Sequence, residues 1–535
     1  MDRMLTAVCL LLAVPVLGVL GSWFGLDAAS LEVLRHQLDT VLPAYAGNSL
    51  LLVACVAVGV AIVGGGTAAL VTLFDFPMRR VFEWALLLPL AMPAYVLAYA
   101  ATDFLQYSGP LQTRLRAYTG LQGALWPDVR SLWGAAAMFV LCLYPYVYLL
   151  ARAALSERAV RLMEAARMLG AGPGRRIREV ALPLARPAIA AGVALALMET
   201  LADYGVGAYF GLQTFTTGIY KAWLVMNDRA AAAQLASLLL LVVGALLWVE
   251  HRAQRRLRFA SVRQGAATGS EARAMRLRGV HAALAFTACA VPAVLGFGLP
   301  VLVLLHMLWV EAQSSEFGLP LARFGQWAWA SFRLAGGAAL AATGLALALA
   351  FALRVHGGAG LRWAARVVSL GYAVPGAVIA VGILLPVGVV QAAWPDSGLT
   401  SLVTGTLAGL MYAYLVRFSS VALQSVEAGY ARVPGAIDES ARMLGAGRRR
   451  LFVDLHLPLL RRASLSALLL VFVDVMKELP ATLVLRPFNS DTLAVVAYQL
   501  ARDERLGEAA LPSLAIVAVG LVPVILLSRS MRAPG

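Results

Sequence analysis

Long apolar runs, each about as long as a membrane is thick, constrain the fold of this chain more than any other feature. A helix needs roughly 20 apolar residues to cross the hydrocarbon core of a bilayer. Runs of this order are Met4–Leu26, Thr40–Phe74, Trp84–Thr102, Ser131–Ala151, Ala230–Val249, Val280–Val310, Leu334–Leu353, Val367–Pro395, Ser397–Val416 and Ala509–Ser528. Since 61% of the residues are apolar and only 14% are charged, the composition excludes a soluble enzyme, a disordered chain and a nucleic-acid-binding domain. We predict an all-α integral membrane protein, because helices satisfy their own backbone hydrogen bonds in lipid.

Two further runs are shorter and end in charged residues, and each takes the fifth place in a set of six. They are Pro187–Met198, interrupted by Glu199 and Asp203, and Ala463–Val473, interrupted by Asp474, Lys477 and Glu478. The pattern predicts about 12 transmembrane helices in two parallel six-helix repeats. The expected domains are residues 1–250, an Arg-rich linker at 251–279, and residues 280–535.

The net charge of +15 is distributed unevenly over the connections between the runs. With the N-terminus placed in the cytoplasm, the inner segments hold 31 of the 44 Lys and Arg residues and the outer loops hold 10. Cytoplasmic loops of membrane proteins carry an excess of these residues. We therefore predict that both termini are cytoplasmic. The same bias assigns the basic charge to membrane topology, so no nucleic acid is expected as a partner.

A cytoplasmic segment that follows the fourth run is repeated in the two halves. Residues 164–187 read EAARMLGAGPGRRIREVALPLARP, and residues 439–462 read ESARMLGAGRRRLFVDLHLPLLRR. Without gaps, 13 of the 24 positions are identical. The second half therefore repeats the first in the same orientation, and the repeated segments form connecting loops at 157–187 and 432–462.

The local pattern of each loop predicts a short amphipathic helix. Apolar residues recur at helical spacing over Arg158–Leu169, and we expect a matching helix over Pro434–Leu444. Gly170 and Gly445 can adopt the left-handed conformation that ends a helix. Such a helix, exposed between two spans, is suited to docking into another protein, and a helix that only lies on the lipid surface is the alternative.

These loops resemble the cytoplasmic signature of ABC-importer permeases. That signature is an EAA triplet, a Gly six residues after the Glu, and a later Leu-Pro pair. The matching residues are Glu164, Ala165, Ala166, Gly170, Leu182 and Pro183 in the first copy, and Glu439, Ser440, Ala441, Gly445, Leu457 and Pro458 in the second. Ser440 departs from the signature, which has Ala at that place. The resemblance implies a fold like that of type I ABC-importer permeases, with each helix coupled to a cleft in an ATPase subunit.

The resemblance also implies partner proteins, because the chain has no nucleotide-binding loop of its own. A phosphate-binding loop of this kind needs a Lys directly after a Gly, and neither Lys221 nor Lys477 follows a Gly. We expect a transport subunit rather than an enzyme, with no cofactor on this chain and ATP on a separate ATPase present in two copies. A periplasmic binding protein would deliver the substrate to this permease in a bacterial-type inner membrane.

Two segments after the fifth runs resemble the fused permeases of ferric-iron importers. They read TLADYGVGAYFGLQTFTTGIYKAW at residues 200–223 and KELPATLVLRPFNSDTLA at residues 477–494. The resemblance covers essentially the whole chain and implies ferric iron as the substrate. Permeases for thiamine, polyamine, phosphonate or sulfate share the scaffold and stay open as alternatives, as do an ion-driven secondary transporter with a 6+6 repeat and a membrane-embedded enzyme. The Cys and His residues form no recognisable metal motif, so any metal ligands are unknown.

Charged residues of the fifth runs mark a candidate translocation path or gate. They are Glu199, Asp203, Asp474, Lys477 and Glu478, and the carboxylates recur at matching places in the two halves. An ionised residue at the bilayer centre costs at least about 2.5–3.5 kcal/mol, so these groups need partners, water or a cation. Structural ion pairing and exposure at the outer face are the alternatives. Single charges near other span ends are interpreted as snorkelling side chains: Arg333 and Arg417.

Overall fold

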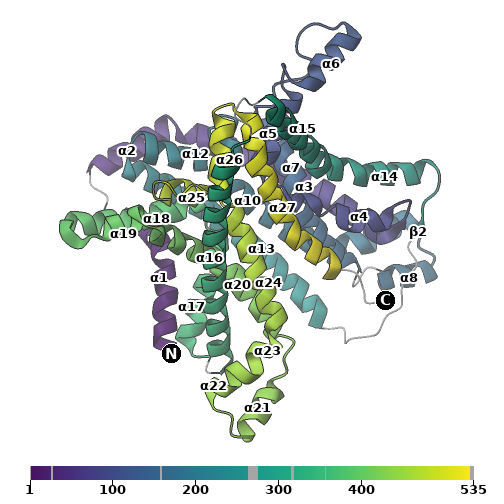
Figure 1. The fold of residues 1–535 in the computed structure, drawn as a ribbon. Helices are drawn as coiled ribbons and strands as arrows, with labels where there is room; N and C mark the ends of the chain where they lie inside the picture. Colours follow the sequence, from purple (N-terminus) through teal and green to yellow (C-terminus); the bar gives the residue numbers. More distant parts are fainter. Residues whose placement is uncertain are drawn as a thin grey trace. The chain divides into compact units, whose positions relative to one another are not determined.

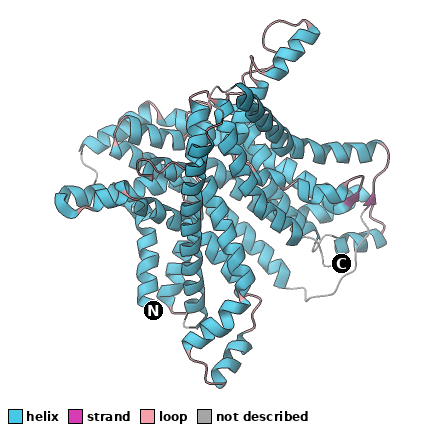
Figure 2. Cartoon of the chain, viewed as in Figure 1, coloured by secondary structure: helices cyan, strands magenta, loops and turns pink. Residues whose placement is uncertain are grey.

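A computed structural model describes residues 2–25, 28–156, 160–262, 275–314, 319–355 and 357–530 of the chain. Helices make up most of this described part (Figure 2). Its only strands are the two-residue segments β1 (Phe74–Asp75) and β2 (Met275–Arg276), which pair in parallel. The predicted all-α fold is confirmed.

Nine helices of the described part are long and apolar enough to cross a membrane, and two bent helix pairs bring the number to eleven if each is one span. The bent pairs are Arg79–Ala91 with Ala94–Thr119, bent by 94°, and Leu399–Gly405 with Leu407–Tyr430, bent by 73°. The remaining predicted span corresponds to α24 (Arg461–Lys477), which has only 17 residues.

The chain forms two compact units, and each unit combines segments from both sequence halves. Unit 1 comprises Met1–Gln37, Ile219–Leu238 and Pro320–Val496, and unit 2 comprises Leu38–Gly218, Leu239–Leu319 and Ala497–Gly535. Each unit therefore takes its largest segment from one half and shorter segments from the other. Within the predicted linker at 251–279, residues 263–274 lie outside the described residues.

Three long helices form the core of unit 2. They are α3 (Leu42–Leu73), α7 (Leu132–Ala154) and α10 (Leu182–Ala202), which pack against one another (Figure 1). A glycine allows close approach where α10 crosses α7, because a Cβ on Gly192 would lie 2.6 Å from the Cα of Val147. Small residues at helix crossings are typical of membrane proteins, in which helices associate by close packing.

Unit 1 has an equivalent core built from α16 (Leu321–Val355), α20 (Leu407–Tyr430) and α24. Helix α1 (Asp2–Gly21) also belongs to this unit and packs along α18 (Gly376–Ala393). A Cβ on Gly18 would lie 2.9 Å from the carbonyl oxygen of Gly382, so the two backbones meet through glycines. The first span of the chain therefore packs on a helix of the second sequence half.

Further helices complete both units. In unit 1 they are α17 (Ala359–Ser369), α19 (Leu399–Gly405), α21 (Gly435–Met443), α22 (Arg448–Arg450), α23 (Leu457–Leu459) and α25 (Pro480–Leu485). In unit 2 they are α4 (Arg79–Ala85), α5 (Ala94–Leu105), α6 (Pro110–Thr119), α8 (Val160–Met168), α9 (Pro173–Arg176), α11 (Gly205–Tyr209), α14 (Val280–Ala293), α15 (Leu299–Ser314) and α27 (Leu506–Ser530). Four helices contain residues of both units: α2 (Ala28–Asp39), α12 (Phe215–Tyr220), α13 (Arg229–Val262) and α26 (Leu493–Arg502).

The fifth span of each half continues past its first charged residue. Glu199 lies inside α10 and Asp474 lies inside α24, so these carboxylates end the apolar runs without ending the helices. Half-buried Glu and Asp cost little helix propensity, which explains why the helices continue. The breaks come at Asp203 and Glu478, where the backbone becomes extended with ψ of 133° and 120°.

Candidate functional site

The repeated loops each contain the predicted short helix. The first copy is α8, and the second is α21, which together with α22 and α23 lies at one end of α20 and α24 (Figure 1). The predicted start of the first helix at Arg158 falls on residues 157–159, which lie outside the described residues. In the second copy Pro434 precedes the helix as its N-cap rather than opening its first turn.

A left-handed glycine ends each helix in the same way. Gly170 has φ +82° and Gly445 has φ +81°, as predicted. The amide of Ala171 donates to the carbonyl of Ala166 at 2.9 Å, and the glycine amide donates three residues back at 3.0 Å. The second copy repeats both bonds, at 3.0 and 2.9 Å. This pattern is the Schellman motif, which fixes the direction in which the chain leaves the helix.

Two large apolar side chains project from the last turn of each helix, directly before the glycine. Met168 and Leu169 are 88% and 87% exposed, and Met443 and Leu444 are 88% and 89% exposed. Such nearly complete exposure of adjacent apolar residues in two copies is typical of a surface that a partner covers. We name these four residues the docking pairs. The sequence signal was present in both copies as Met-Leu-Gly, but exposure could not be derived from it.

The signature residues have the same exposure in both copies. Glu164, Ala165, Glu439 and Ser440 are exposed, and Ala166 and Ala441 are half-buried. The two Leu-Pro pairs are exposed as well: Leu182, Pro183, Leu457 and Pro458. Each loop therefore presents one matching surface, which starts at the EAA-like triplet and continues to the Leu-Pro pair.

A π-helical turn joins each loop to the following long helix. These turns are η4 (Ile177–Ala181) and η9 (Leu451–His456). The amide of Leu182 donates to the carbonyl of Ile177, five residues back, and Leu457 donates likewise to Phe452. Proline lacks the amide and crowds the carbonyl four residues before it. The widened turn before each Leu-Pro pair accommodates that proline. The first loop then continues into α10 as helix, and the second continues into α23, which a turn at Leu460 separates from α24.

We call α8 and α21 the docking helices. The glycine that ends α21 leads us to expect contrasting effects on ATPase binding from two substitutions at Gly445. Among the described residues, no neighbouring atom lies within 4 Å of a Cβ added at Gly170 or Gly445. A side chain there causes no clash and costs only the strain of a left-handed backbone. We expect Gly445→Leu to cost about 1–2 kcal/mol of local stability, because the left-handed conformation is unfavourable for Leu. Gly445→Asn should be nearly silent, since Asn tolerates this conformation. The measurement is the amount of ATPase that co-purifies with each variant, and equal amounts would contradict a role for the cap.

The two residues at the breaks of the fifth spans act as helix caps. Asp203 accepts the amide of Val206 at the start of α11, at 2.8 Å. Glu478 accepts the amides of Ala481 and Thr482 at the start of α25, at 2.9 and 3.0 Å. A carboxylate at a helix N-terminus satisfies free amides and favours the positive end of the helix dipole. Both carboxylates therefore shape the backbone where each span ends.

Glu478 also forms a buried ion pair with Arg417. Its Oε1 lies 3.6 Å from Nη1 of Arg417, and the two side chains are only 2% and 9% exposed. The snorkelling interpretation of Arg417 is therefore wrong, because its guanidinium lies inside unit 1, whereas Arg333 is exposed. Gly376 completes the site, since a Cβ there would lie 2.7 Å from Glu478 Oε1 and 3.0 Å from Arg417 Nη1.

The other predicted path residues are less enclosed. Glu199, Asp203, Asp474 and Lys477 are all half-buried. In the described ranges, no three His, Cys, Asp or Glu side chains are placed to hold a metal ion. Their role in a translocation path remains a prediction.

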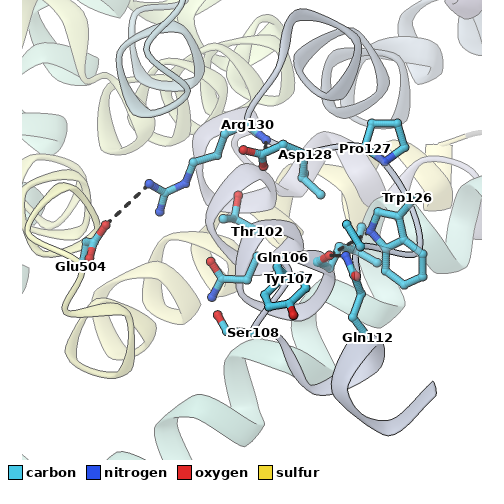
Figure 3. Close-up of a pocket in the computed structure, with 13 residues that line it drawn as sticks. Thr102, Gln106, Tyr107, Ser108, Gln112, Trp126, Pro127, Asp128, Arg130 and Glu504 are labelled. Atoms are coloured by element: carbon cyan, nitrogen blue, oxygen red, sulfur yellow. Dashed lines mark hydrogen bonds and ion pairs between the residues drawn. The ribbon is translucent and has the colours of Figure 1, made fainter. Parts of the chain in front are cut away.

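A half-open polar cavity of about 350 Å³ lies in unit 2 near the base of α6 (Figure 3). No motif in the sequence indicates this cavity. Nη1 of Arg130 lies 3.6 Å from Oε1 of Glu504. Gln112 donates to the Leu105 carbonyl at 3.0 Å and accepts the Leu125 amide at 3.1 Å. Because these groups already bond within the protein, they fix the position of α6, and we assign no substrate site to the cavity.

Comparison with known proteins identifies the family. The family described as binding-protein-dependent transport system inner membrane component matches residues 59–259 and 341–533, one match in each sequence half. The Fe(3+)-transport system permease protein FbpB 2 of Haemophilus influenzae is 25% identical over 487 residues, which cover 90% of this chain and 89% of that protein.

Two other relatives match a single segment of the chain. The putative 2-aminoethylphosphonate transport system permease protein PhnV of Salmonella typhimurium is 30% identical over 35% of this chain and 67% of its own length. The molybdenum transport system permease protein ModB of Escherichia coli is 28% identical over 30% of this chain and 70% of its own length. The relatives are permeases, which confirms the predicted transport subunit. Because the family matches cover most of the sequence, the chain belongs to the binding-protein-dependent transport system inner membrane components.

Proposed function

We propose that this chain is the membrane-spanning subunit of an ABC importer for ferric iron, with both permease halves in one polypeptide. The observation that carries the importer mechanism is the matched pair of docking helices, each with an exposed apolar pair before a left-handed glycine. Support for the substrate comes from a ferric-iron permease relative that aligns over nearly the full length of both chains.

Two ATPase subunits are the proposed partners, one on α8 and one on α21. ATP binds to those subunits, and this chain carries no cofactor of its own. When ATP draws the ATPases together, each docking helix moves with the subunit that covers it. The π-helical turn η4 transmits this movement to α10, into which it continues directly, and η9 transmits it to α24 through α23 and the turn at Leu460. A periplasmic binding protein supplies the substrate on the opposite side.

The proposed translocation path follows the ends of the fifth spans. Glu199, Asp474 and Lys477 are half-buried charged groups near the ends of these spans, and Asp203 and Glu478 each fix the helix break of their own span. Ferric iron is a hard cation that prefers oxygen ligands. Half-buried carboxylates would attract it, and the absence of a closed ligand set among the described residues agrees with weak, transient binding.

Uptake by sealed vesicles tests the substrate. The vesicles carry this chain, its ATPase and its binding protein, and radiolabelled ferric iron is expected to accumulate only with ATP. Glu199→Gln with Asp474→Asn should lower this uptake while ATPase binding persists. Accumulation of 2-aminoethylphosphonate or molybdate without iron would overturn the substrate assignment and leave the importer class intact.

The proposed orientation places both termini and both docking helices in the cytoplasm. Ala359 in α17 and Ser397 beside α19 are exposed on connections assigned to opposite sides. In a chain whose four native cysteines are replaced, Ser397→Cys should react with a membrane-impermeant thiol reagent on intact cells, and Ala359→Cys should react only after lysis. The reverse labelling pattern would contradict the orientation.

A further inference from the structure

Four polar side chains of unit 1 contact one another at the buried face of α21, the second docking helix. Asp438 on α21 is 7% exposed. Its Oδ2 lies 2.6 Å from Nε of Arg354 on α16, and its Oδ1 lies 3.0 Å from Nε2 of His456 in η9. The other ring nitrogen of His456 lies 2.9 Å from the hydroxyl of Tyr430 at the end of α20. Since an ionised carboxylate only accepts, Arg354 and His456 both donate to Asp438.

Arg354 also fixes the chain that leads into α21. Its guanidinium donates to the backbone carbonyls of Tyr430, Val433 and Pro434, at 3.4, 2.9 and 3.1 Å. The His456 ring packs edge-on against Phe351 of α16, with centroids 5.3 Å apart. One arginine therefore connects α16 to both the start and the buried face of the docking helix.

The Asp438 carboxyl is ionised, so its hydrogen bonds from Arg354 and His456 are charge-assisted. Burial raises the pKa of the Asp438 carboxyl, but hydrogen bonds from Arg354 and His456 outweigh it, so the pKa lies below its ordinary value of 3.8. A depressed carboxyl pKa gives stability that is present above the ordinary pKa and is lost as pH falls through the lowered one. Asp438 therefore remains ionised and paired near neutral pH.

The first half has apolar residues at three of the four corresponding positions. At the repeat offset, Tyr430, Asp438 and His456 align with Leu155, Met163 and Ala181. Those three residues are 2%, 6% and 2% exposed. The positions are buried in both halves, but directional hydrogen bonds replace apolar packing in the second.

We propose that Arg354, Tyr430, Asp438 and His456 form a polar clamp that positions α21 rigidly against α16 and α20, whereas the described first-half residues that match Tyr430, Asp438 and His456 are apolar. The clamp rests on the proposed function, in which α21 docks an ATPase. Hydrogen bonds in a buried network fix distance and orientation, while apolar contacts are non-directional. The two halves then respond differently to the same ATPase movement. In the second half α21 moves less relative to α16 and α20, so more of the movement reaches those helices.

Hydrogen exchange on the full chain, without partners, tests the clamp itself. Asp438→Asn keeps the side-chain size and removes the charge, and the amides of 435–443 should then exchange about tenfold faster, as expected for loss of a charge-assisted hydrogen bond. Exchange in α8 should not change. A second variant carries the first-half residues, Tyr430→Leu, Asp438→Met and His456→Ala, and its α21 should exchange as fast as α8. Native protection of α21 in either variant would overturn the clamp.

Coupling is measured as solute taken up per ATP hydrolysed in vesicles with all partners. In the triple variant this ratio should fall on the order of tenfold with ATPase still bound. Arg505→Ala is the matched control, because it removes a surface ion pair to Glu508, at 2.5 Å, that lies outside both loops, and it should leave the ratio unchanged. A native ratio in the triple variant would refute the clamp alone, whereas a native chain that retains no ATPase would refute the proposed function.

Discussion

Glu478→Ala is expected to destabilise the protein by about 3–5 kcal/mol, because it removes a buried carboxylate from its ion pair with the Arg417 guanidinium. The loss includes more than one ion pair. Besides the amides of Ala481 and Thr482, the carboxylate accepts the Thr482 hydroxyl at 2.6 Å, and that hydroxyl contacts Tyr414 at 2.7 Å. Removing the carboxylate therefore disrupts a buried network as well as the start of α25. The measurement is the thermal unfolding temperature and the folded yield of the purified chain in detergent.

Two further variants separate charge burial from capping. Asp203→Asn alters the matching residue of the other half and should change stability little, because Asn and Asp are comparable N-caps. Arg417→Met combined with Glu478→Gln removes both charges of this buried pair. The Gln oxygen can still accept a hydrogen bond at the start of α25, so the double variant should recover most of the lost stability. If the Glu478→Ala variant unfolds at the same temperature as the native chain and only its transport falls, the carboxylate acts in the translocation path and does not stabilise the fold.

The local geometry of the docking loops could be predicted from the sequence because its causes are local. Gly170 and Gly445 follow an amphipathic segment, and a left-handed glycine ends a helix without help from distant residues. The spans were likewise predicted from apolar length alone, since the bilayer sets that length. Three predicted spans depart from this criterion among the described residues: two are bent helix pairs, and α24 has only 17 residues before the helix break at Glu478.

Contacts between distant segments could not be predicted in this way. Arg417 is a single arginine near the end of an apolar run, and only the folded structure shows it beside Glu478. Arg354 and Asp438 are 84 positions apart, and neither belongs to a motif. The packing of α1 on α18 is similarly non-local, because it depends on glycines in both sequence halves. Periodicity identifies which face of a helix is apolar, but it does not identify the helix that covers it.

Removing the docking pairs should abolish ATPase binding while leaving the fold intact. Burial of a Met or Leu side chain contributes about 1.5–3 kcal/mol. Met443→Ser with Leu444→Ser therefore removes roughly 3–6 kcal/mol from one interface, which corresponds to more than a hundredfold weaker binding. Both side chains are almost fully exposed in the isolated chain, so the substitutions cost little folding stability. The measurement is ATPase affinity for the chain in nanodiscs, with thermal unfolding in parallel.

The control for these substitutions is an exposed leucine outside both loops. Leu121, between α6 and α7, is 58% exposed, and Leu121→Ser should leave ATPase binding unchanged. Serine pairs at Met168 and Leu169 should weaken binding at the other loop to a similar extent, because the two surfaces match in exposure and in backbone geometry. Native affinity with all four residues replaced would show that the ATPase contacts other parts of the loops, and the docking pairs would then need another partner to explain their exposure.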